Sequence, residues 1–382
     1  MQIPIDQIIP RLLDLVIAIQ QIPAPSFHEA ERAEFVRARF EEEGLQGVEI
    51  DATGNVYACL ACNQLQSAAK TQPIIVTAHL DTVFSPGVDL SVSRDRDRIL
   101  APGIGDNSLG VAGLFGLVWA LCAGGLSLPG DLWLVANVCE EGLGNLHGIK
   151  AVVERFEPRQ GRSTSRPGPL AYIIVEGMAL GQVYQRGLGV RRYRLKVHTA
   201  GGHSWIDYGQ PSAIHELATL STRITSLELP RSPRTTLNVG VISGGSSVNT
   251  IAAEAMLELD LRSENTATLE DVVRQVEQIV CSVQKPGVIV ELESIGQRPS
   301  GEIPAEHRLV RLAQDCLREV GFEPRLNIGS TDANLPLSLG LPAITIGLTT
   351  GGRAHTVNEF INIPPLEKGL KQLVSLVSRA WD

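Results

Sequence analysis

Residues 73–83 read PIIVTAHLDTV, a short apolar run that ends in a histidine and an aspartate. The unbroken series of apolar residues predicts a strand over 73–80 that is buried on both faces. His79 would then lie at the carboxyl end of this strand. Asp81, two positions further on, would share its face if the strand continues. In an open α/β sheet, this is the end at which ligand sites form.

Strands of the same kind recur along the chain and alternate with helices. Further apolar strands are predicted at 131–139, 170–177 and 342–348, and helices at 108–125, 306–321 and 364–381. The helix at 108–125 is apolar on nearly every side, which indicates burial. An earlier helix, ending near Glu43, would open with a capping box formed by Ser26 and Glu29. This alternation is typical of an α/β domain whose mainly parallel sheet is covered on both faces.

Residues 187–300 show a different pattern of predicted strands and helices. Their pattern predicts the order strand, helix, strand, strand, helix, strand, which suits a small α+β, ferredoxin-like layer. We therefore interpret 187–300 as a lid domain inserted into the first domain. The catalytic domain would consist of 1–186 and 301–382.

The bulk composition argues against several classes of protein. A length of 382 residues is natural for two domains. The net charge of −9 disfavours nucleic acid and anionic membranes as partners. No apolar run reaches the ~18 residues that span a bilayer, and the first residues lack the basic segment of a signal peptide. Six scattered cysteines suggest reduced thiols, and together these features predict a cytoplasmic protein.

Potential metal ligands follow the predicted strands in several places. They are His79 with Asp81, Asp106 in the glycine-rich GIGDN, Glu140 with Glu141, Glu176, and His355. Any one of these residues alone would be unremarkable, because a single histidine or a Glu-Glu pair is usually structural or solvated. Together they place charge at successive apolar strand ends, where burial costs several kcal/mol unless the charge is paired or metal-bound. Two imidazoles with several carboxylates suit zinc or another divalent first-row metal.

Six short stretches that span nearly the whole chain carry a family resemblance. They are AHLDTV (78–83), GIGDNSLG (103–110), CEEGLGNLHG (139–148), VEG (175–177), GGHSW (201–205) and GGRAHTVNE (351–359). In this order they resemble the co-catalytic dizinc metallopeptidase and deacylase family. That family includes peptidase T, glutamate carboxypeptidase, acetylornithine deacetylase, succinyl-diaminopimelate desuccinylase and aminoacylase. The stretches GNLHG, GGHSW and STDAN favour the peptidase T-like side.

The resemblance implies a metal site with two ions. His79 and Glu176 would hold one zinc, and Glu141 and His355 the other, with Asp106 bridging both. Cobalt or manganese could replace zinc. The family often has aspartate where this chain has Glu176, and glutamate occurs there among its deacylase-like members.

The resemblance also implies roles for residues that do not bind metal. Asp81 would orient the imidazole of His79, and Glu140 would be the general base. His203 would help to stabilise the oxyanion, often in the site of a neighbouring subunit. Asn249 and Arg262 would contact the carboxylate end of the substrate. A homodimer through the lid domain is a further expectation of this kind.

The stretch STDAN (330–334) resembles a family segment that precedes the last core strand. Two interpretations stay open. The segment could touch the substrate, or it could begin a helix that is capped by Ser330 or Asp332.

The expected function is metal-dependent hydrolysis of the amide bond in small peptides. A deacylase of N-acyl amino acids is the alternative within the family. A non-catalytic metal-binding or peptide-binding homologue is the alternative from another class, and the presence of Glu140 together with all the ligands argues against it. A two-metal phosphoesterase is disfavoured, because no cluster of Lys and Arg accompanies the motifs.

Overall fold

The computed structural model describes residues 5–62, 71–157 and 168–382. The chain divides into two compact units. Unit 1 comprises Met1–Gly187 and Gly301–Asp382, and unit 2 comprises Leu188–Ser300. Each unit has its own hydrophobic core.

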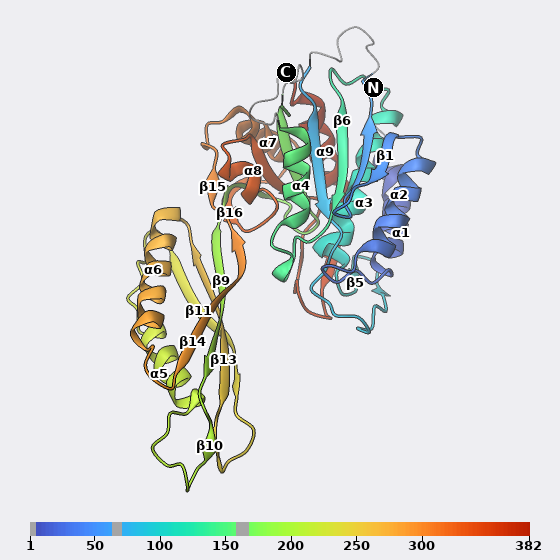
Figure 1. The fold of residues 1–382 in the computed structure, drawn as a ribbon. Helices are drawn as coiled ribbons and strands as arrows, with labels where there is room; N and C mark the ends of the chain where they lie inside the picture. The colour runs from blue at the N-terminus through green and yellow to red at the C-terminus, as the bar shows by residue number, and fades with distance from the viewer. Residues whose placement is uncertain (1–4, 63–70, 158–167) are drawn as a thin grey trace. The chain divides into compact units, whose positions relative to one another are not determined.

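A mixed sheet forms the centre of unit 1 (Figure 1). Among the described residues it has nine strands, in the order β1-β2-β6-β3-β7-β17-β8-β15, with β16 paired to β8. The middle is parallel and consists of β6 (Leu132–Asn137), β3 (Ile74–His79), β7 (Ala171–Glu176) and β17 (Ala343–Gly347). The flanking strands are β1 (Gln46–Ile50), β2 (Val56–Leu60), β8 (Gln182–Gly187), β15 (Gly301–Glu302) and β16 (Arg325–Gly329). The predicted α/β fold with a mainly parallel centre is confirmed, while antiparallel pairing at β1, β2, β8 and β15 was not anticipated.

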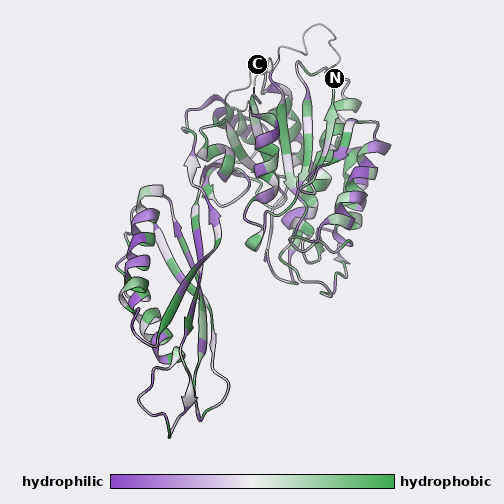
Figure 2. Cartoon of the chain, in the orientation of Figure 1, coloured by the Kyte–Doolittle hydropathy of each residue, from purple (hydrophilic) through white to green (hydrophobic). Residues whose placement is uncertain are grey.

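Helices cover both faces of this sheet, as expected. One face carries α1 (Ile5–Gln20), α2 (Ala30–Glu42), α3 (Leu109–Ala123), α7 (Arg308–Glu319) and α9 (Leu366–Arg379). The other face carries α4 (His147–Phe156) and α8 (Asn334–Ser338). In Figure 2 the inner strands are largely hydrophobic, whereas the outer helices combine both colours. Burial of one apolar side of each helix is what holds the layers together.

Helix α3 is apolar all round because it lies inside the domain. A helical stretch, Ile104–Ala123, has the length and composition of a membrane span, but 78% of its apolar window is buried within the protein. A buried core helix meets the same criteria as a membrane span. The predicted burial of this helix is therefore confirmed.

The capping box predicted at Ser26 is wrong. Helix α2 begins at Ala30, and its N-cap residue, Glu29, makes no side-chain cap bond. The Ser26 hydroxyl instead donates to the Asp81 carboxylate at 2.6 Å. Because Ser26 lies three residues before the N-cap residue Glu29, it does not occupy the position from which a side chain accepts the N–H groups of the first turn.

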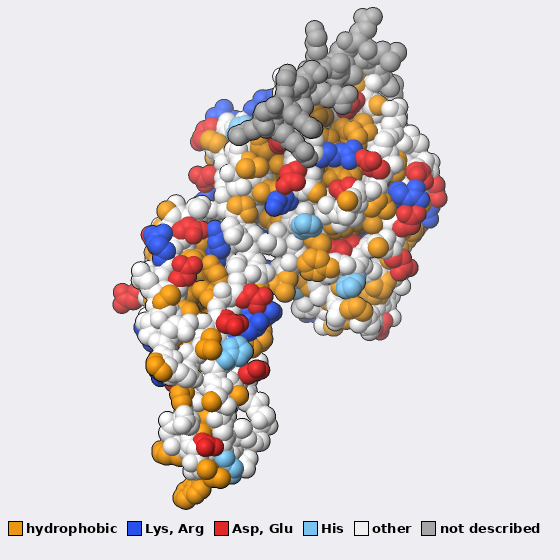
Figure 3. Space-filling model, in the orientation of Figure 1, with side chains coloured by type: hydrophobic (Ala, Val, Ile, Leu, Met, Phe, Trp, Pro, Cys, Tyr) orange, Lys and Arg blue, Asp and Glu red, His pale blue; other side chains and the backbone are white. Residues whose placement is uncertain are grey.

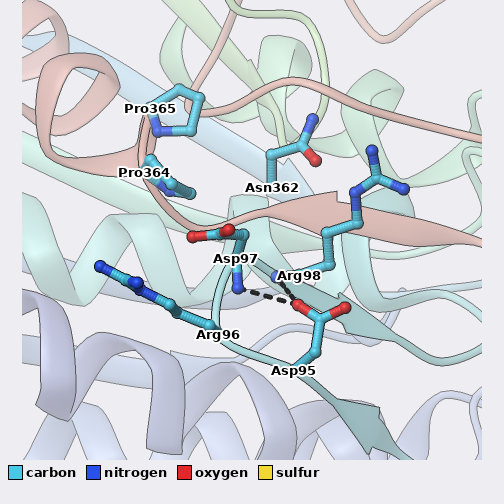
Figure 4. Close-up of a pocket in the computed structure, with 7 residues that line it drawn as sticks. All are labelled: Asp95, Arg96, Asp97, Arg98, Asn362, Pro364 and Pro365. Atoms are coloured by element: carbon cyan, nitrogen blue, oxygen red, sulfur yellow. Dashed lines mark hydrogen bonds between the residues drawn. The ribbon is translucent and has the colours of Figure 1, made fainter.

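A second, smaller sheet of unit 1 has the order β18-β19-β5-β4. Its strands are β18 (Gly351–Gly352), β19 (Phe360–Asn362), β5 (Arg98–Leu100) and β4 (Ser93–Arg94). A surface hollow of about 650 Å³ lies at the β4–β5 turn (Figure 4). There the Asp95 carboxylate accepts the backbone N–H groups of Asp97 and Arg98 at 2.8 and 2.7 Å. These polar groups stabilise a turn, and none of the predicted site residues lines the hollow.

Unit 2 contains the strands and helices predicted for 187–300. Strands β9 (Gly189–His198), β11 (Thr235–Gly244), β13 (Glu254–Ser263) and β14 (Ile289–Arg298) form an antiparallel sheet in the order β11-β13-β9-β14. Helices α5 (Ala213–Thr225) and α6 (Thr266–Ser282) pack on one face. Basic side chains of β9 form ion pairs with the neighbouring strands, such as Arg192 with Asp260 at 2.9 Å. Beyond this sheet, β10 (Gly202–His203) pairs with β12 (Thr250–Ile251) at a tip.

Candidate metal centre

The predicted ligands converge because the inner strands of the sheet are parallel. Strands β6, β3 and β7 are neighbours, so their carboxyl ends meet at one edge. His79 is the last residue of β3, and Glu176 is the last residue of β7. Glu140 and Glu141 follow shortly after the end of β6. His355 arrives from the segment between β18 and β19.

The Asp106 carboxylate lies between two histidines. Its Oδ1 is 3.2 Å from His79 Nε2, and its Oδ2 is 3.1 Å from His355 Nε2. Glu176 Oε2 is 3.7 Å from the same nitrogen of His79. Glu141 Oε1 is 3.3 Å from the same nitrogen of His355. The five side chains thus form two groups, each with one histidine and one glutamate, that share a single aspartate.

The pKa values of this cluster are shifted because its side chains include more carboxyl groups than histidines. Burial alone would lower the pKa of His79, but the surrounding carboxylates, that of Glu176 foremost, raise it well above its usual value. The hydrogen bonds to Asp106 and Glu141 raise the pKa of His355 to about 10. Burial raises the pKa of both Glu141 and Glu176 to about 7. For Asp106 burial acts in the same direction, but the two histidines lower the pKa below its usual value.

This donor set fits divalent cations. Ligand atoms of His79, Asp106 and Glu141, which come from both groups, all lie within 4.8 Å of one another, so the two groups form one compact site. Bound cations would offset the cost of burying Glu141 and Glu176 in their ionised forms. Nitrogen and oxygen donors suit zinc and related first-row ions. A carboxylate with one oxygen toward each histidine is suited to bridging two ions.

Asp81 lies behind His79, and it also holds the two glutamates. The Nδ1 atom of His79 is 3.0 Å from the Asp81 backbone oxygen and 3.5 Å from its Oδ1. The nearer partner is therefore the backbone carbonyl, whereas the prediction invoked the carboxylate. The two carboxylate oxygens accept the backbone N–H groups of Glu140 and Glu141, each at 2.9 Å. One aspartate thus orients a histidine and fixes the neighbouring Glu-Glu pair.

Two further residues, which no sequence pattern indicated, hold the Asp106 loop. Glu359 is fully buried, and its carboxylate accepts the backbone N–H groups of Gly105 at 2.7 Å and Asp106 at 2.8 Å. Burial raises the pKa of Glu359 to about 7. The Asn107 side chain donates to the Val175 carbonyl at 2.8 Å, which ties the loop to β7. Glu359 stands in the quoted GGRAHTVNE, but no feature of that stretch indicated its backbone partners.

Three predicted residues belong to unit 2. His203 lies in β10, where its Nδ1 accepts the Trp205 backbone N–H at 3.2 Å. Asn249 lies beside it, because its carbonyl accepts the Ser204 N–H at 3.0 Å. Arg262 lies toward the opposite end of β13 and pairs with Asp260 at 2.7 Å. A strand of this length spans about 30 Å, so one copy of the chain does not bring Asn249 and Arg262 to the same small carboxylate.

Comparison with known proteins supplies independent findings. The model of peptidase family M20/M25/M40 matches residues 75–379. The Bacillus subtilis (strain 168) protein YqjE is 24% identical over 97% of this chain and 98% of its own length. A Mycobacterium tuberculosis protein named for succinyl-diaminopimelate desuccinylase is 26% identical over 92% of this chain and 93% of its own. The structure of a Staphylococcus aureus tripeptidase superposes with a TM-score of 0.79 at 20% identity, covering 97% of this chain and 98% of that one.

We expect the affinity for zinc to depend on the hydrogen bonds between Glu359 and the Asp106 loop. Replacing Glu359 by Gln exchanges one acceptor oxygen for an NH₂ group that would face backbone N–H donors. The Asp106 loop should lose its fixed position, and zinc affinity should fall roughly 10–100-fold. Isothermal titration of chelator-treated protein with zinc measures this change. The matched control is Glu367→Gln on the exposed side of α9, where the carboxylate pairs with Lys371. Equal affinities for the two variants would contradict the role given to Glu359.

Proposed function

The chain belongs to peptidase family M20/M25/M40, and on that premise we propose a two-metal hydrolase of small peptides that uses Glu140 as its general base. The chain is an enzyme that hydrolyses amide bonds, as its family membership indicates. The finer claims, which are the two ions, zinc as the metal, peptides as the substrate and the cytoplasm as the location, form the proposal.

One observation carries the two-ion claim. The Asp106 carboxylate has one oxygen at 3.2 Å from His79 Nε2 and the other at 3.1 Å from His355 Nε2. A site for a single ion has no need of two histidines on opposite oxygens of one carboxylate. Glu176 lies beside His79, and Glu141 lies beside His355. With the shared Asp106, each proposed ion therefore has three protein ligands.

The chain's own residues account for proton transfer. When bound, the two ions would polarise the scissile carbonyl and lower the pKa of a water molecule. Glu140, only 5% exposed, would take a proton from that water and deliver it to the leaving nitrogen. Asp81 fixes the backbone of Glu140, so the carboxylate is positioned before the substrate arrives. His203 is proposed to stabilise the oxyanion, as its motif implies.

Two considerations favour peptides over N-acyl amino acids. The motifs lean towards peptidase T, and the tripeptidase superposes over almost the full length of both chains. The likeness to a protein named for a desuccinylase keeps the deacylase alternative open. The two functions use the same chemistry at the metal centre and differ in which acyl group occupies the site.

A substrate panel with a matched inactive variant tests the function. Zinc-, cobalt- and manganese-loaded protein is incubated with di- and tripeptides and with N-acetyl and N-succinyl amino acids, and released amine is measured. We expect the peptides to be hydrolysed fastest. Glu140→Gln should lower kcat at least ~10³-fold while both metals stay bound, because the amide cannot accept the proton. Loss of metal from this variant would make Glu140 a ligand, and preferential hydrolysis of N-acyl amino acids would select the deacylase.

Metal counting tests the two groups of ligands separately. Elemental analysis of protein equilibrated with zinc should find about two ions per chain. Glu176→Ala and Glu141→Ala should each retain about one ion, because each removes a ligand from only one group. Asp106→Ala should lose affinity for both. Glu302→Ala, at an exposed ion pair with Arg186, is the control. A single tight ion that is indifferent to Glu176→Ala would refute the dinuclear proposal.

A homodimer through unit 2 is part of the proposal. Large apolar side chains are exposed around the tip of unit 2, including Trp205 (86%), Ile206 (77%), Tyr208 (90%) and Val248 (103%). Figure 3 shows hydrophobic side chains gathered at that end. Such a patch is typical of an interaction surface. A second copy would also allow Asn249 and Arg262 to act on one substrate from different subunits.

Sedimentation velocity tests the dimer. The variant Trp205→Ser/Tyr208→Ser should weaken association by roughly 2 kcal/mol or more, because buried aromatic side chains dominate interface energies. That is roughly a 30-fold rise in the dissociation constant. Leu126→Ser, at an exposed apolar side chain of unit 1, should leave association unchanged. A wild-type protein that sediments as a monomer at micromolar concentration would contradict the proposal.

A further inference from the structure

The segment that carries Glu140 is held by side chains from several distant parts of the chain. Backbone N–H groups of four consecutive residues donate to them: Val138 to Asn55 Oδ1 (3.0 Å), Cys139 to Glu29 Oε1 (3.0 Å), and Glu140 and Glu141 to the two oxygens of Asp81 (2.9 Å each). The segment belongs to no helix or strand, so these bonds replace a regular ladder. Its geometry therefore depends on the side chains that clamp it.

A further contact holds the start of this segment. Asn137, the last residue of β6, donates from its side chain to Asp332 Oδ2 at 2.7 Å. Both side chains are 0% exposed. Within the described part of the chain, Asp332 Oδ1 and Asn137 Oδ1 have no hydrogen-bond partner. A buried, half-satisfied carboxyl group is costly to keep, and such groups persist where function needs them.

Neither interpretation of the STDAN stretch describes Asp332. Helix α8 begins after Ala333 and has no side-chain cap bond, so capping by Ser330 or Asp332 is wrong. An Asp332 side chain with no exposed surface does not reach a substrate. The observed partner is an amide on the strand that leads to the base.

The surroundings of Asp332 favour its neutral form. The Asn137 amide that donates to Asp332 is uncharged and offsets only part of the cost of burying a carboxylate, which amounts to several kcal/mol when no cation is near. Burial, together with the negative charges of Glu140 and Glu176, raises the pKa of Asp332 well above its usual value, and His79 opposes the shift. A neutral acid adds no further negative charge beside the metal centre.

We propose that the Asp332–Asn137 pair positions the general base: a buried carboxyl–amide contact fixes the end of β6, from which the chain runs directly to Glu140. The inference rests on the proposed function, because it takes Glu140 to be the base. Asp332 acts through Asn137 and is therefore a positioning residue. The pair completes a clamp whose other members, Asn55, Glu29 and Asp81, hold the backbone.

Three variants separate positioning from folding. Asp332→Leu leaves the Asn137 amide buried without its partner, so both thermal stability and kcat should fall, kcat roughly 10–100-fold. Asn137→Leu/Asp332→Leu replaces both polar groups by apolar ones. Stability should recover, because removing both partners of a buried pair is nearly neutral, but kcat should stay low. Asn137→Asp/Asp332→Asn exchanges the partners, keeps the carboxyl–amide contact, and should restore kcat to within about 3-fold of wild type.

The measurements are kcat and KM on the best substrate of the panel, metal content, melting temperature, and the infrared band of a protonated carboxyl group. We expect the loss in kcat with KM and metal content unchanged, and a carboxyl band that is weaker in Asp332→Leu than in wild type by the contribution of one carboxyl group. Wild-type kcat in the double-leucine variant, or a swapped variant as slow as Asp332→Leu, would overturn the proposal. Loss of metal from both variants would also overturn it, by assigning the pair to the metal centre.

The panel control separates this inference from the proposed function. If Glu140→Gln keeps turnover, the base assignment fails and this inference fails with it. If Glu140→Gln abolishes turnover but the double-leucine variant is fully active, the proposed function stands and only this inference fails.

Discussion

The Asp106 carboxylate between His79 and His355 is the contact on which the rest of the centre depends. Its two oxygens face two imidazole nitrogens, at 3.2 and 3.1 Å, which brings the end of β3 and the segment after β18 to one point. This requires a loop that is fixed on both sides, and Glu359 and Asn107 fix it by binding backbone groups. A shift of the loop would disturb both groups of ligands at once, because both contain Asp106.

The sequence predicted those parts of the structure that follow from local pattern. Buried apolar runs indicated β3, β6 and β7, and their parallel pairing then placed His79, Glu141 and Glu176 at one edge. The pairing of the outer strands escaped prediction, because it depends on contacts between segments far apart. Glu359 and Asp332 escaped for the same reason. Their partners are a backbone N–H and a side-chain amide more than a hundred residues away, and no sequence spacing encodes such a contact.

The centre accommodates more carboxylates than its proposed ions can neutralise, and the structure deals with the surplus in three ways. Asp81 accepts hydrogen bonds from a hydroxyl and two backbone N–H groups. Glu359 accepts backbone N–H groups of the Asp106 loop. Burial and the negative charge of Glu140 raise the pKa of Asp332 well above its usual value. Hydrogen bonding at Asp81 and Glu359, and the raised pKa of Asp332, each reduce the cost of burying a carboxyl group without another cation.

A buried guanidinium, that of Arg32, lies behind the clamp and interacts with two of its carboxyl groups. Arg32 is 2% exposed, and it donates to the carbonyl oxygen of Leu80 at 2.7 Å. Burial lowers the pKa of Arg32 to about 10, while Asp81 and Glu29 oppose that shift and keep the group charged. Its charge in turn favours the ionised form of Asp81 and offsets part of the burial that raises the pKa of Glu29. The proposed base is thus held by two carboxyl groups that a buried guanidinium supports from behind.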